Sequence, residues 1–343
     1  MSWWEQVRND PLTWLLGEDP DQPGVRHLTL TELLDRASDD ERVIAARRAA
    51  MSSGPVAAIL RAQHPEGYWE RPGAGYASKY RGTIWQVTFL AQLGADGADP
   101  RVRAGCEYVL EHSRSDRGGF SIDANRSGMV HCLQGNLCGA LIDLGWLGDP
   151  RLDAALDWLA RSITGEGIAL SEDKDAAVRY LRSGNSAPGF VCAANNQLPC
   201  AWGAVKAMLA LGKVPERHRT PTIKAAVAAG LGFLLGHDPA AADYPSGYSD
   251  KPSGSWFRFG YPLGYVTDVL QNLEALVALG QGQNPRLHNA LEMALGKQDE
   301  HGRWRMEYSY NGKMWADIER RGEASKWVTW RALRVLKRSD EQA

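Results

Sequence analysis

The chain has 343 residues, of which 44% are hydrophobic, with 39 Lys and Arg against 41 Asp and Glu and a net charge of -2. This balance gives no general attraction to nucleic acid or to anionic lipid, so neither is expected as a partner. The N-terminus lacks a basic start followed by an apolar core, and the apolar stretch 225–236 is too short to span a bilayer. Five cysteines, an odd number without compact spacing, fit a reducing compartment, so we expect a cytoplasmic protein.

Residues 1–39 are expected to form an N-terminal arm, and residues 40–51 and 55–63 a first pair of helices. Further along, the sequence repeats with a period of about fifty residues, which is typical of architectures built from helical hairpins. Each unit contains an apolar helix, a glycine, a turn with proline, and a second helix that is charged on one face. The units are expected to start near residues 83, 136, 201 and 268, and a half unit occupies 325–337 before the tail 338–343.

The junctions within each unit favour helical hairpins. Gly94 and Gly145 follow the last apolar positions of two helices, and Asp99-Pro100 and Asp149-Pro150 supply a cap and a first-turn residue for the next ones. Because the first helix of each unit is nearly free of charge, we expect it to be the inner one, with the second helix outside. The sequence therefore predicts an all-α fold, an α/α toroid of about six helical hairpins that forms a single domain over residues 1–343.

Two loops share the pattern Gln-x-x-x-Gly-x-Trp, at Gln63–Trp69 and Gln298–Trp304. This pattern resembles the QW repeat of squalene and oxidosqualene cyclases, and Gly118-Gly119-Phe120 is similar to the repeat of protein prenyltransferase β subunits. The resemblance covers residues 55–337 and implies an α/α toroid of the small bacterial kind. The chain lacks the Asp-x-Asp-Asp acid of squalene cyclases, so triterpene cyclisation started by that acid is not expected.

Cysteine and histidine gather where the third and fourth inner helices are expected to begin. His131 and Cys132 start one of these helices, Cys200 starts the next, and Cys192 lies in the loop between them. Thiolates brought together by tertiary structure suit Zn²⁺, so Cys132, Cys192 and Cys200 are candidate metal ligands. The resemblance to prenyltransferases implies that this end of the toroid is suitable for zinc. Reduced thiols in the core are the alternative interpretation.

Asp268 and His131 are the candidate catalytic residues. Asp268 stands at an otherwise apolar helix start, where a carboxylate is costly to bury. It could act as a general acid or base with a raised pKa, as a metal ligand, or as a hydrogen-bond acceptor for a metal ligand; the alternative is a hydrogen-bonded helix cap.

Aromatic residues are concentrated near the same helix starts, in a chain with 13 Trp and 11 Tyr. An aromatic wall of this kind suits a hydrophobic or cationic ligand. The candidate substrate-binding residues are Tyr80, Trp85, Trp256, Phe259, Tyr261 and Tyr265. Two long loops, 171–197 and 238–255, could cover this end as lids.

The sequence lacks a phosphate-binding P-loop, a dinucleotide glycine fingerprint and a Gly-x-Ser-x-Gly elbow. We expect an enzyme that acts on an apolar small molecule, isoprenoid-like or polycyclic, in the toroid cavity. Its chemistry would be acid-base and zinc-assisted, in the cyclase, lyase or hydrolase class. The alternative is a prenyltransferase-like or lipid- or peptide-binding module whose cysteines are structural.

Overall fold

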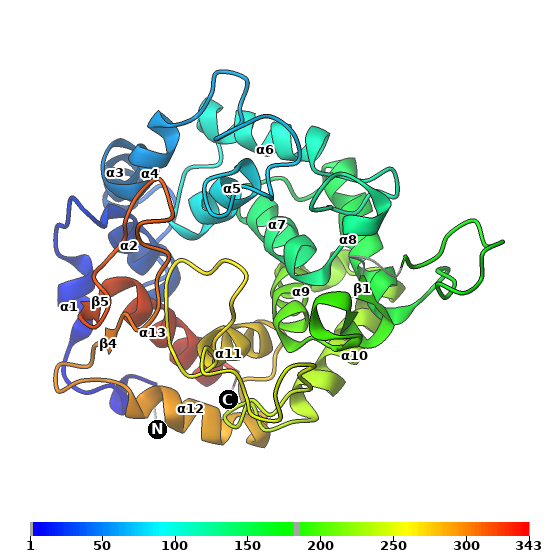
Figure 1. The fold of residues 1–343 in the computed structure, drawn as a ribbon. Helices are drawn as coiled ribbons and strands as arrows, with labels where there is room; N and C mark the ends of the chain where they lie inside the picture. Colours follow the sequence, from blue (N-terminus) through cyan, green and yellow to red (C-terminus); the bar gives the residue numbers. More distant parts are fainter. Residues whose placement is uncertain (1–2, 182–185, 343) are drawn as a thin grey trace.

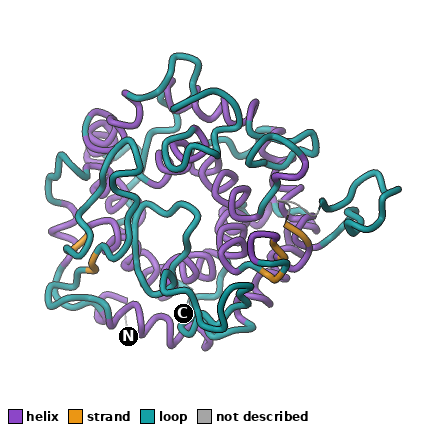
Figure 2. Tube along the Cα trace, viewed as in Figure 1, coloured by secondary structure: helices purple, strands orange, loops and turns teal. Residues whose placement is uncertain are grey.

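The computed structural model describes residues 3–181 and 186–342. Viewed along its axis, the molecule is a ring of helices with long loops over one end (Figures 1 and 2). In this described part, the inner ring consists of α2 (Pro23–Leu28), α5 (Thr83–Gln92), α7 (His131–Asp143), α9 (Ala201–Lys213), α11 (Val269–Ala278) and α13 (Lys326–Asp340). A ring of this kind is the α/α toroid that the sequence repeat predicts.

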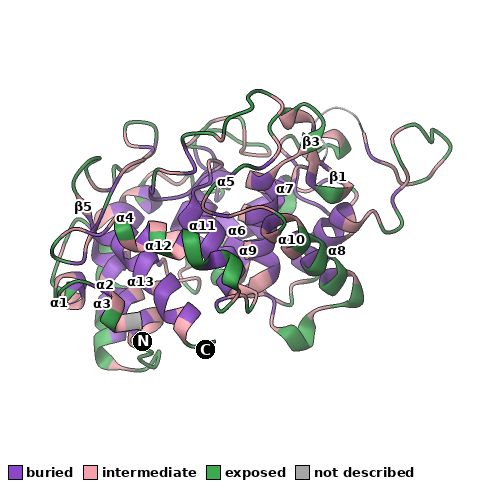
Figure 3. Ribbon diagram, turned by 90° about the horizontal axis from the view of Figure 1, so that it is seen from below, coloured by how far each residue is buried: buried purple, intermediate pink, exposed green. Residues whose placement is uncertain are grey.

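A second layer of helices surrounds the inner ring (Figure 1). It contains α3 (Glu41–Ser52), α4 (Gly54–Arg61), α6 (Pro100–His112), α8 (Pro150–Thr164), α10 (Pro221–Leu235) and α12 (His288–Gly296), and α1 (Pro11–Leu16) lies outside α13. Buried residues concentrate in the middle of the molecule, and exposed ones lie on the outer helices and loops (Figure 3). The charge pattern of the sequence correctly marks α5, α7, α9 and α11 as inner helices, whereas the inner helix α13 carries several charged residues and the outer helix α10 only one.

The hairpin junctions have the capping geometry expected from the sequence. The side chains of Asp99 and Asp149 accept hydrogen bonds of 2.8 Å from the N–H groups of Arg101 and Arg151 at the starts of α6 and α8. Gly145, after α7, has a φ of 84°, a left-handed conformation that glycine adopts without a steric cost. Helices α5 and α7 therefore stop and turn into α6 and α8 within a few residues.

The two Gln-x-x-x-Gly-x-Trp loops join neighbouring parts of the ring. The Nε1 atom of Trp69 donates to the carbonyl of Ile59 in α4 at 2.7 Å, and Gln63 donates to the carbonyl of Arg101 in α6 at 2.9 Å. In the second loop, Trp304 donates to the carbonyl of Ala294 in α12 at 2.6 Å, and Gln298 donates to the backbone of Gln6 at 3.1 Å. These bonds connect α4 to α6, and α12 to the N-terminal segment.

The segment expected as an N-terminal arm supplies α1 and α2. Helix α2 closes the inner ring, because a Cβ atom at Gly24 would lie 2.2 Å from the carbonyl oxygen of Leu93 and 3.0 Å from the ring of Trp327. A short π-helical turn, Thr29–Leu33, continues α2 towards α13. Glycine at position 24 therefore lets α2 approach both α5 and α13 closely.

Short strands shape the loops at the end where the inner helices begin. β1 (Ser186–Ala187), β2 (Val191–Cys192) and β3 (Leu198–Pro199) form an antiparallel sheet, and β4 (Trp304–Arg305) pairs with β5 (Ala324–Ser325). Residues 165–181, the described part of the chain directly after α8, project away from the ring (Figure 1). Among the helices described, none combines the length and apolarity needed to cross a membrane.

Candidate functional site

A loop between α10 and α11 crosses the hollow of the toroid (Figure 1). We call residues 260–267 the plug. The side chain of Gln92 in α5 forms two hydrogen bonds of 2.7 Å with the backbone of Leu263, and Asn136 in α7 donates to the carbonyl of Gly264 at 2.9 Å. Leu263 lines a pocket on one side of the plug, and Tyr265 lines a different pocket on the other. The plug therefore divides the hollow in two.

The first pocket, the thiol pocket, has a volume of about 490 Å³ and lies where α7 and α9 begin. Cys132, Cys192 and Cys200 all line it, as the sequence predicts for neighbouring helix starts. Aromatic residues form much of the remaining wall, namely Trp202, Tyr244, Tyr248, Trp256 and Tyr265. The structure therefore brings the three candidate thiols together with two of the predicted aromatic residues, Trp256 and Tyr265.

Cys192 and Cys200 interact directly. Cys192 ends β2 and Cys200 is the N-cap residue of α9, and the N–H of Cys200 donates to the carbonyl of Phe190 at 2.8 Å. The thiol of Cys200 donates a hydrogen bond to the sulfur of Cys192, and the N–H groups of Ala194 and Asn195 also point to that sulfur. These donors lower the pKa of Cys192 to about 6, although burial opposes the shift. The donors around this sulfur therefore favour the thiolate form of Cys192.

The pKa values of the other two thiols move in the opposite direction. The bond to Cys192 and burial raise the pKa of Cys200, and burial raises the pKa of Cys132 to about 11. Lys206 in α9 lies close enough to act electrostatically on Cys132, and burial lowers the pKa of Lys206 to about 8. Its ammonium group donates to the carbonyl of Val266 at 3.3 Å, to the hydroxyl of Thr267, and to Gln271 at 3.2 Å. Cys192 is therefore the thiol best suited to act as a nucleophile.

His131 is next to Cys132 in the sequence but faces another way. Its Nε2 atom lies 3.0 Å from the hydroxyl of Ser162 in the outer helix α8, and its ring packs against Phe190. Burial lowers the pKa of His131 to about 3, so the ring is neutral at physiological pH. The structure does not bring His131 to the thiol pocket or to Asp268, and its contacts support a role in packing α7 against α8.

Asp268 lies at the start of α11, only 2% exposed. Its carboxylate caps the helix through the N–H of Gln271 at 2.7 Å and accepts the N–H of Gly260 at 3.2 Å. Arg331 in α13, which is 1% exposed, completes its environment with two bonds of 2.9 and 3.0 Å. All four bonds end on the two carboxylate oxygens, so the geometry matches the capping alternative rather than that of a group open to substrate.

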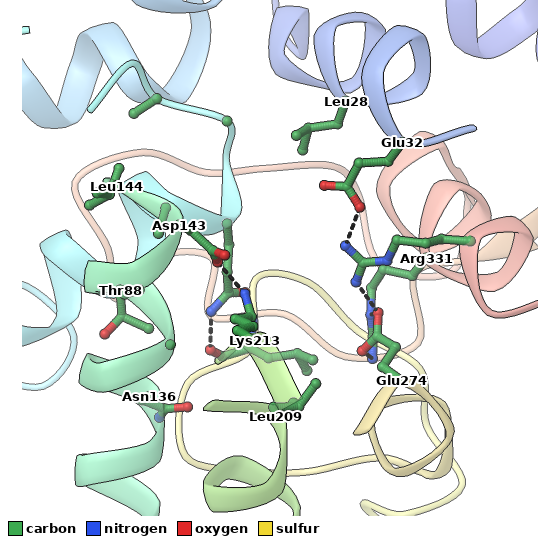
Figure 4. A pocket seen from close by; sticks show the side chains of 18 of the residues that line it. Leu28, Glu32, Thr88, Asn136, Asp143, Leu144, Leu209, Lys213, Glu274 and Arg331 are labelled. Atoms are coloured by element: carbon green, nitrogen blue, oxygen red, sulfur yellow. Dashed lines mark hydrogen bonds and ion pairs between the residues drawn. The ribbon is translucent and has the colours of Figure 1, made fainter. Parts of the chain in front are cut away.

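Arg331 begins a ladder of ion pairs in the second hollow of the toroid. It also contacts Glu274 at 2.8 Å; Glu274 contacts Arg334 at 2.7 Å, and Arg334 contacts Glu32 at 2.9 Å. The arginines lower the pKa values of both glutamates against the effect of burial. Figure 4 shows part of this second hollow, the central pocket, which has a volume of about 560 Å³ and opens where the inner helices end.

The remaining aromatic candidates do not line the thiol pocket. Tyr80 and Trp85 pack against each other, with ring centroids 4.8 Å apart, and Tyr80 also packs against Tyr310 at 4.1 Å. Phe259 is buried beneath Lys297. Tyr261 stacks on Trp327 at 4.6 Å and lines the central pocket instead. The expected single aromatic cavity is therefore replaced by a filled plug with one pocket on either side.

The zinc prediction depends on whether the thiols form a complete ligand set. All five cysteines are free thiols. Over residues 3–181 and 186–342, no group of three or more His, Cys, Asp or Glu side chains is arranged to hold a metal ion. Three thiols share one pocket, but they do not have a ligand geometry, so we derive no chemical step through zinc.

Several residues that shape these sites are not among the candidates predicted from the sequence. Lys206 in α9 and Glu274 in α11 are charged residues in largely apolar inner helices, and that contrast was a signal in the sequence; Arg331 lies in α13, which carries several other charged residues. Asn195 was not predicted either. Its side-chain amide donates hydrogen bonds to the carbonyls of Pro199 at 2.8 Å and Pro245 at 3.1 Å. It thereby connects the two loops on either side of the thiol pocket.

No protein-family model matches the chain, and no curated protein matches it significantly. Among solved structures, an unsaturated glucuronyl hydrolase specific for heparin is similar, with a TM-score of 0.51 and 12% identity over 94% of this chain and 87% of that one. The type II terpene cyclase MstE from Scytonema has a TM-score of 0.30 and 17% identity over 84% of this chain and 97% of the cyclase. A glycosidase has a TM-score of 0.33 and 12% identity over 86% and 96%. The first likeness confirms the α/α toroid, and at such identity it concerns the fold alone.

Proposed function

We propose that the chain is an enzyme that acts on a small, largely apolar molecule in the thiol pocket, with Cys192 as its nucleophile. The observation that carries this proposal is the environment of the Cys192 sulfur, which receives hydrogen bonds from Cys200 and two backbone N–H groups while it lines an aromatic pocket. Activated cysteines occupy such sites, whereas structural cysteines are buried without donors. Cys138 in α7 has the latter kind of environment, because burial alone raises its pKa.

The size and walls of the pocket define the class of substrate. A volume of about 490 Å³ is in the range of small-molecule sites, roughly 300–1,000 Å³. Tyr244 and Trp256, with ring centroids 5.3 Å apart, form one side, and Trp202 and Tyr265, 5.7 Å apart, form another. Apolar or ring-containing molecules fit these surfaces better than strongly charged ones do.

The proposed step is nucleophilic attack. The Cys192 thiolate forms a bond to an electrophilic carbon of the substrate, and the bond from that carbon to its leaving group breaks. The thiol of Cys200 gives its proton to the leaving group, and attack of water on the same carbon then breaks the bond to sulfur, releases the product, restores the Cys192 thiolate and returns a proton to Cys200. Asp268 and His131 take no part in this step, since their side chains are engaged elsewhere.

Alkylation of Cys192 by iodoacetamide tests the proposal. With a pKa of about 6, we expect a rate that rises tenfold per pH unit below that value and levels off above it. Replacing Cys200 by Ala removes the first donor, so the midpoint should move towards 9.0, the ordinary value for cysteine. Peptide mass spectrometry assigns the modified residue, and Cys138→Ala serves as the control, with the same profile as the wild type.

Two results would contradict this role. One is a midpoint near 9 in the wild type, and the other is retention of the fast-reacting thiol in Cys192→Ser. If Cys192 reacts as expected but a panel of apolar esters and thioesters binds without turnover, the binding-module alternative replaces the enzyme.

Zinc-assisted chemistry is a second candidate, favoured by the presence of three thiols at one pocket. It requires Cys132, Cys192 and Cys200 to converge on one ion, as thiolates bound at about 2.3 Å. Elemental analysis of the purified protein is the test. About one zinc per chain, lost in Cys132→Ser and in Cys200→Ser, would support it; metal-free protein that takes up no added Zn²⁺ would end it.

A further inference from the structure

The central pocket carries more positive than negative charge. Its lining includes six cationic side chains, Arg47, Lys206, Lys213, Arg331, Arg334 and Arg338. Its carboxylates are Glu32, Asp96, Asp143 and Glu274. Asp268 does not line the pocket, but it is an ion-pair partner of Arg331 and adds one more negative charge. The wall remains positive when Asp268 is included, and this surplus is independent of the thiol pocket on the other side of the plug.

The surplus charge is located at particular residues. Lys213 is paired with Asp143, and Arg331 and Arg334 belong to the ion-pair ladder. Arg47, on α3, has no ion pair or hydrogen bond to any residue that the structure describes. Arg338 shares Glu32 with Arg334, at a longer distance of 3.4 Å. Arg47 and Arg338 are therefore the two cations of the pocket whose charges are least compensated by neighbouring carboxylates.

Crowding of the arginines makes an anion favourable here. Burial and the neighbouring charge of Arg334 lower the pKa of Arg338 below its ordinary value. An anion close to Arg338 would offset that repulsion, and its attraction is stronger in a partly buried pocket than at an open surface. Guanidinium groups also match the planar geometry of carboxylate and phosphate oxygens.

We propose that the central pocket is a binding site for a small polar molecule that carries a carboxylate or phosphate group, held by Arg47 and Arg338. The volume of about 560 Å³ accommodates a small metabolite and excludes a folded partner. The ladder of ion pairs fixes Arg331 and Arg334 on one wall, and Tyr261 and Leu263 of the plug also line the pocket. The site is open at the end of the toroid where the inner helices finish.

Thermal unfolding and calorimetric titration with citrate and with inorganic phosphate test this site, with NaCl at matched ionic strength as the reference. We expect saturable binding of at least one of the two anions. Because a hydrogen bond to a charged group is worth about 1.5–3 kcal/mol, Arg47→Gln should weaken binding by roughly tenfold or more. Arg48→Gln is the matched control: Arg48 is the exposed neighbour of Arg47 on α3, does not line the pocket, and should leave affinity unchanged.

Each outcome decides the proposal. Preference for citrate identifies a carboxylate ligand and preference for phosphate a phosphate ligand, and both support the site. Equal loss of affinity in Arg47→Gln and Arg48→Gln would show general surface attraction, and it would overturn the proposal. No saturable binding beyond the NaCl reference would overturn it too. Cys192→Ser should bind the anion normally, so failure of this site and failure of the thiol chemistry can be distinguished.

Discussion

Replacing Arg331 by Met removes the cation that compensates Asp268. In this variant Glu274 keeps its bond of 2.7 Å to Arg334, whereas Asp268 keeps only the two backbone N–H groups of Gln271 and Gly260. A buried charge that loses its partner costs about 3–5 kcal/mol of unfolding free energy. Because Asp268 is 2% exposed, water cannot replace the guanidinium without moving the plug or α13. We therefore expect Arg331→Met to destabilise the toroid by this amount.

Urea unfolding followed by circular dichroism measures the effect. The double variant Asp268→Asn/Arg331→Met removes both charges, and it should recover about 1–3 kcal/mol, because directly contacting residues couple in this range. Arg320→Met is the control: that exposed arginine has only a surface pair to Glu323, at 3.8 Å, and the change should stay within about 0.5 kcal/mol.

Unfolding of Arg331→Met at the same urea concentration as the control would refute a stabilising role of Arg331 at Asp268. That role would also be refuted if the double variant were less stable than Arg331→Met alone. In contrast, an Asp268→Asn variant with normal stability and abolished turnover would restore Asp268 as a catalytic residue.

Two further predictions concern the packing of the inner ring. Between pH 6.5 and about 3 the unfolded chain binds a proton at His131 that the folded chain does not. The free energy of unfolding should therefore decrease by roughly 1.4 kcal/mol for each unit by which the pH is lowered, from this residue alone. His131→Asn should flatten the profile of urea stability against pH in this window, and His301→Gln, an exposed control, should not. A Cβ atom at Gly135 would lie 2.3 Å from the backbone of Lys206, so Gly135→Ala should destabilise by about 1–3 kcal/mol. Gly232→Ala on the exposed face of α10, where the Cβ atom meets nothing within 4 Å, should stabilise by about 0.5–1 kcal/mol in the same assay.

Local signals in the sequence were sufficient to predict where several helices begin and that Cys132, Cys192 and Cys200 line one pocket. Asp99 and Asp149 cap helices because each carboxylate accepts a hydrogen bond from the unpaired N–H group two residues further along the chain. Cys132 and Cys200 meet because neighbouring inner helices begin at the same end of the ring. His131 could have been separated from Cys132 by the same reasoning, since adjacent residues on a helix point in different directions. These features depend on short-range geometry that the sequence pattern records.

The role of Asp268 depends on contacts that no local pattern records. Its partner Arg331 is 63 residues further along the chain. Asp268 stands out at an apolar helix start, but Arg331 is one of several basic residues of α13, and the sequence does not say which of them turns towards α11. The plug is equally hidden, because Gln92 and Leu263 are 171 residues apart when they bond. Such pairings follow from closure of the whole ring.

Closure by the plug explains why one toroid has two unlike pockets. The plug residues Val266 and Thr267 accept hydrogen bonds from Lys206, which lines the central pocket and whose charge also acts on the thiols. Because this ammonium group is buried with uncharged acceptors, it supplies positive charge to both sides of the plug without blocking either pocket. An aromatic pocket lined by three cysteines and a polar pocket lined by arginines can therefore coexist on the two sides of the plug.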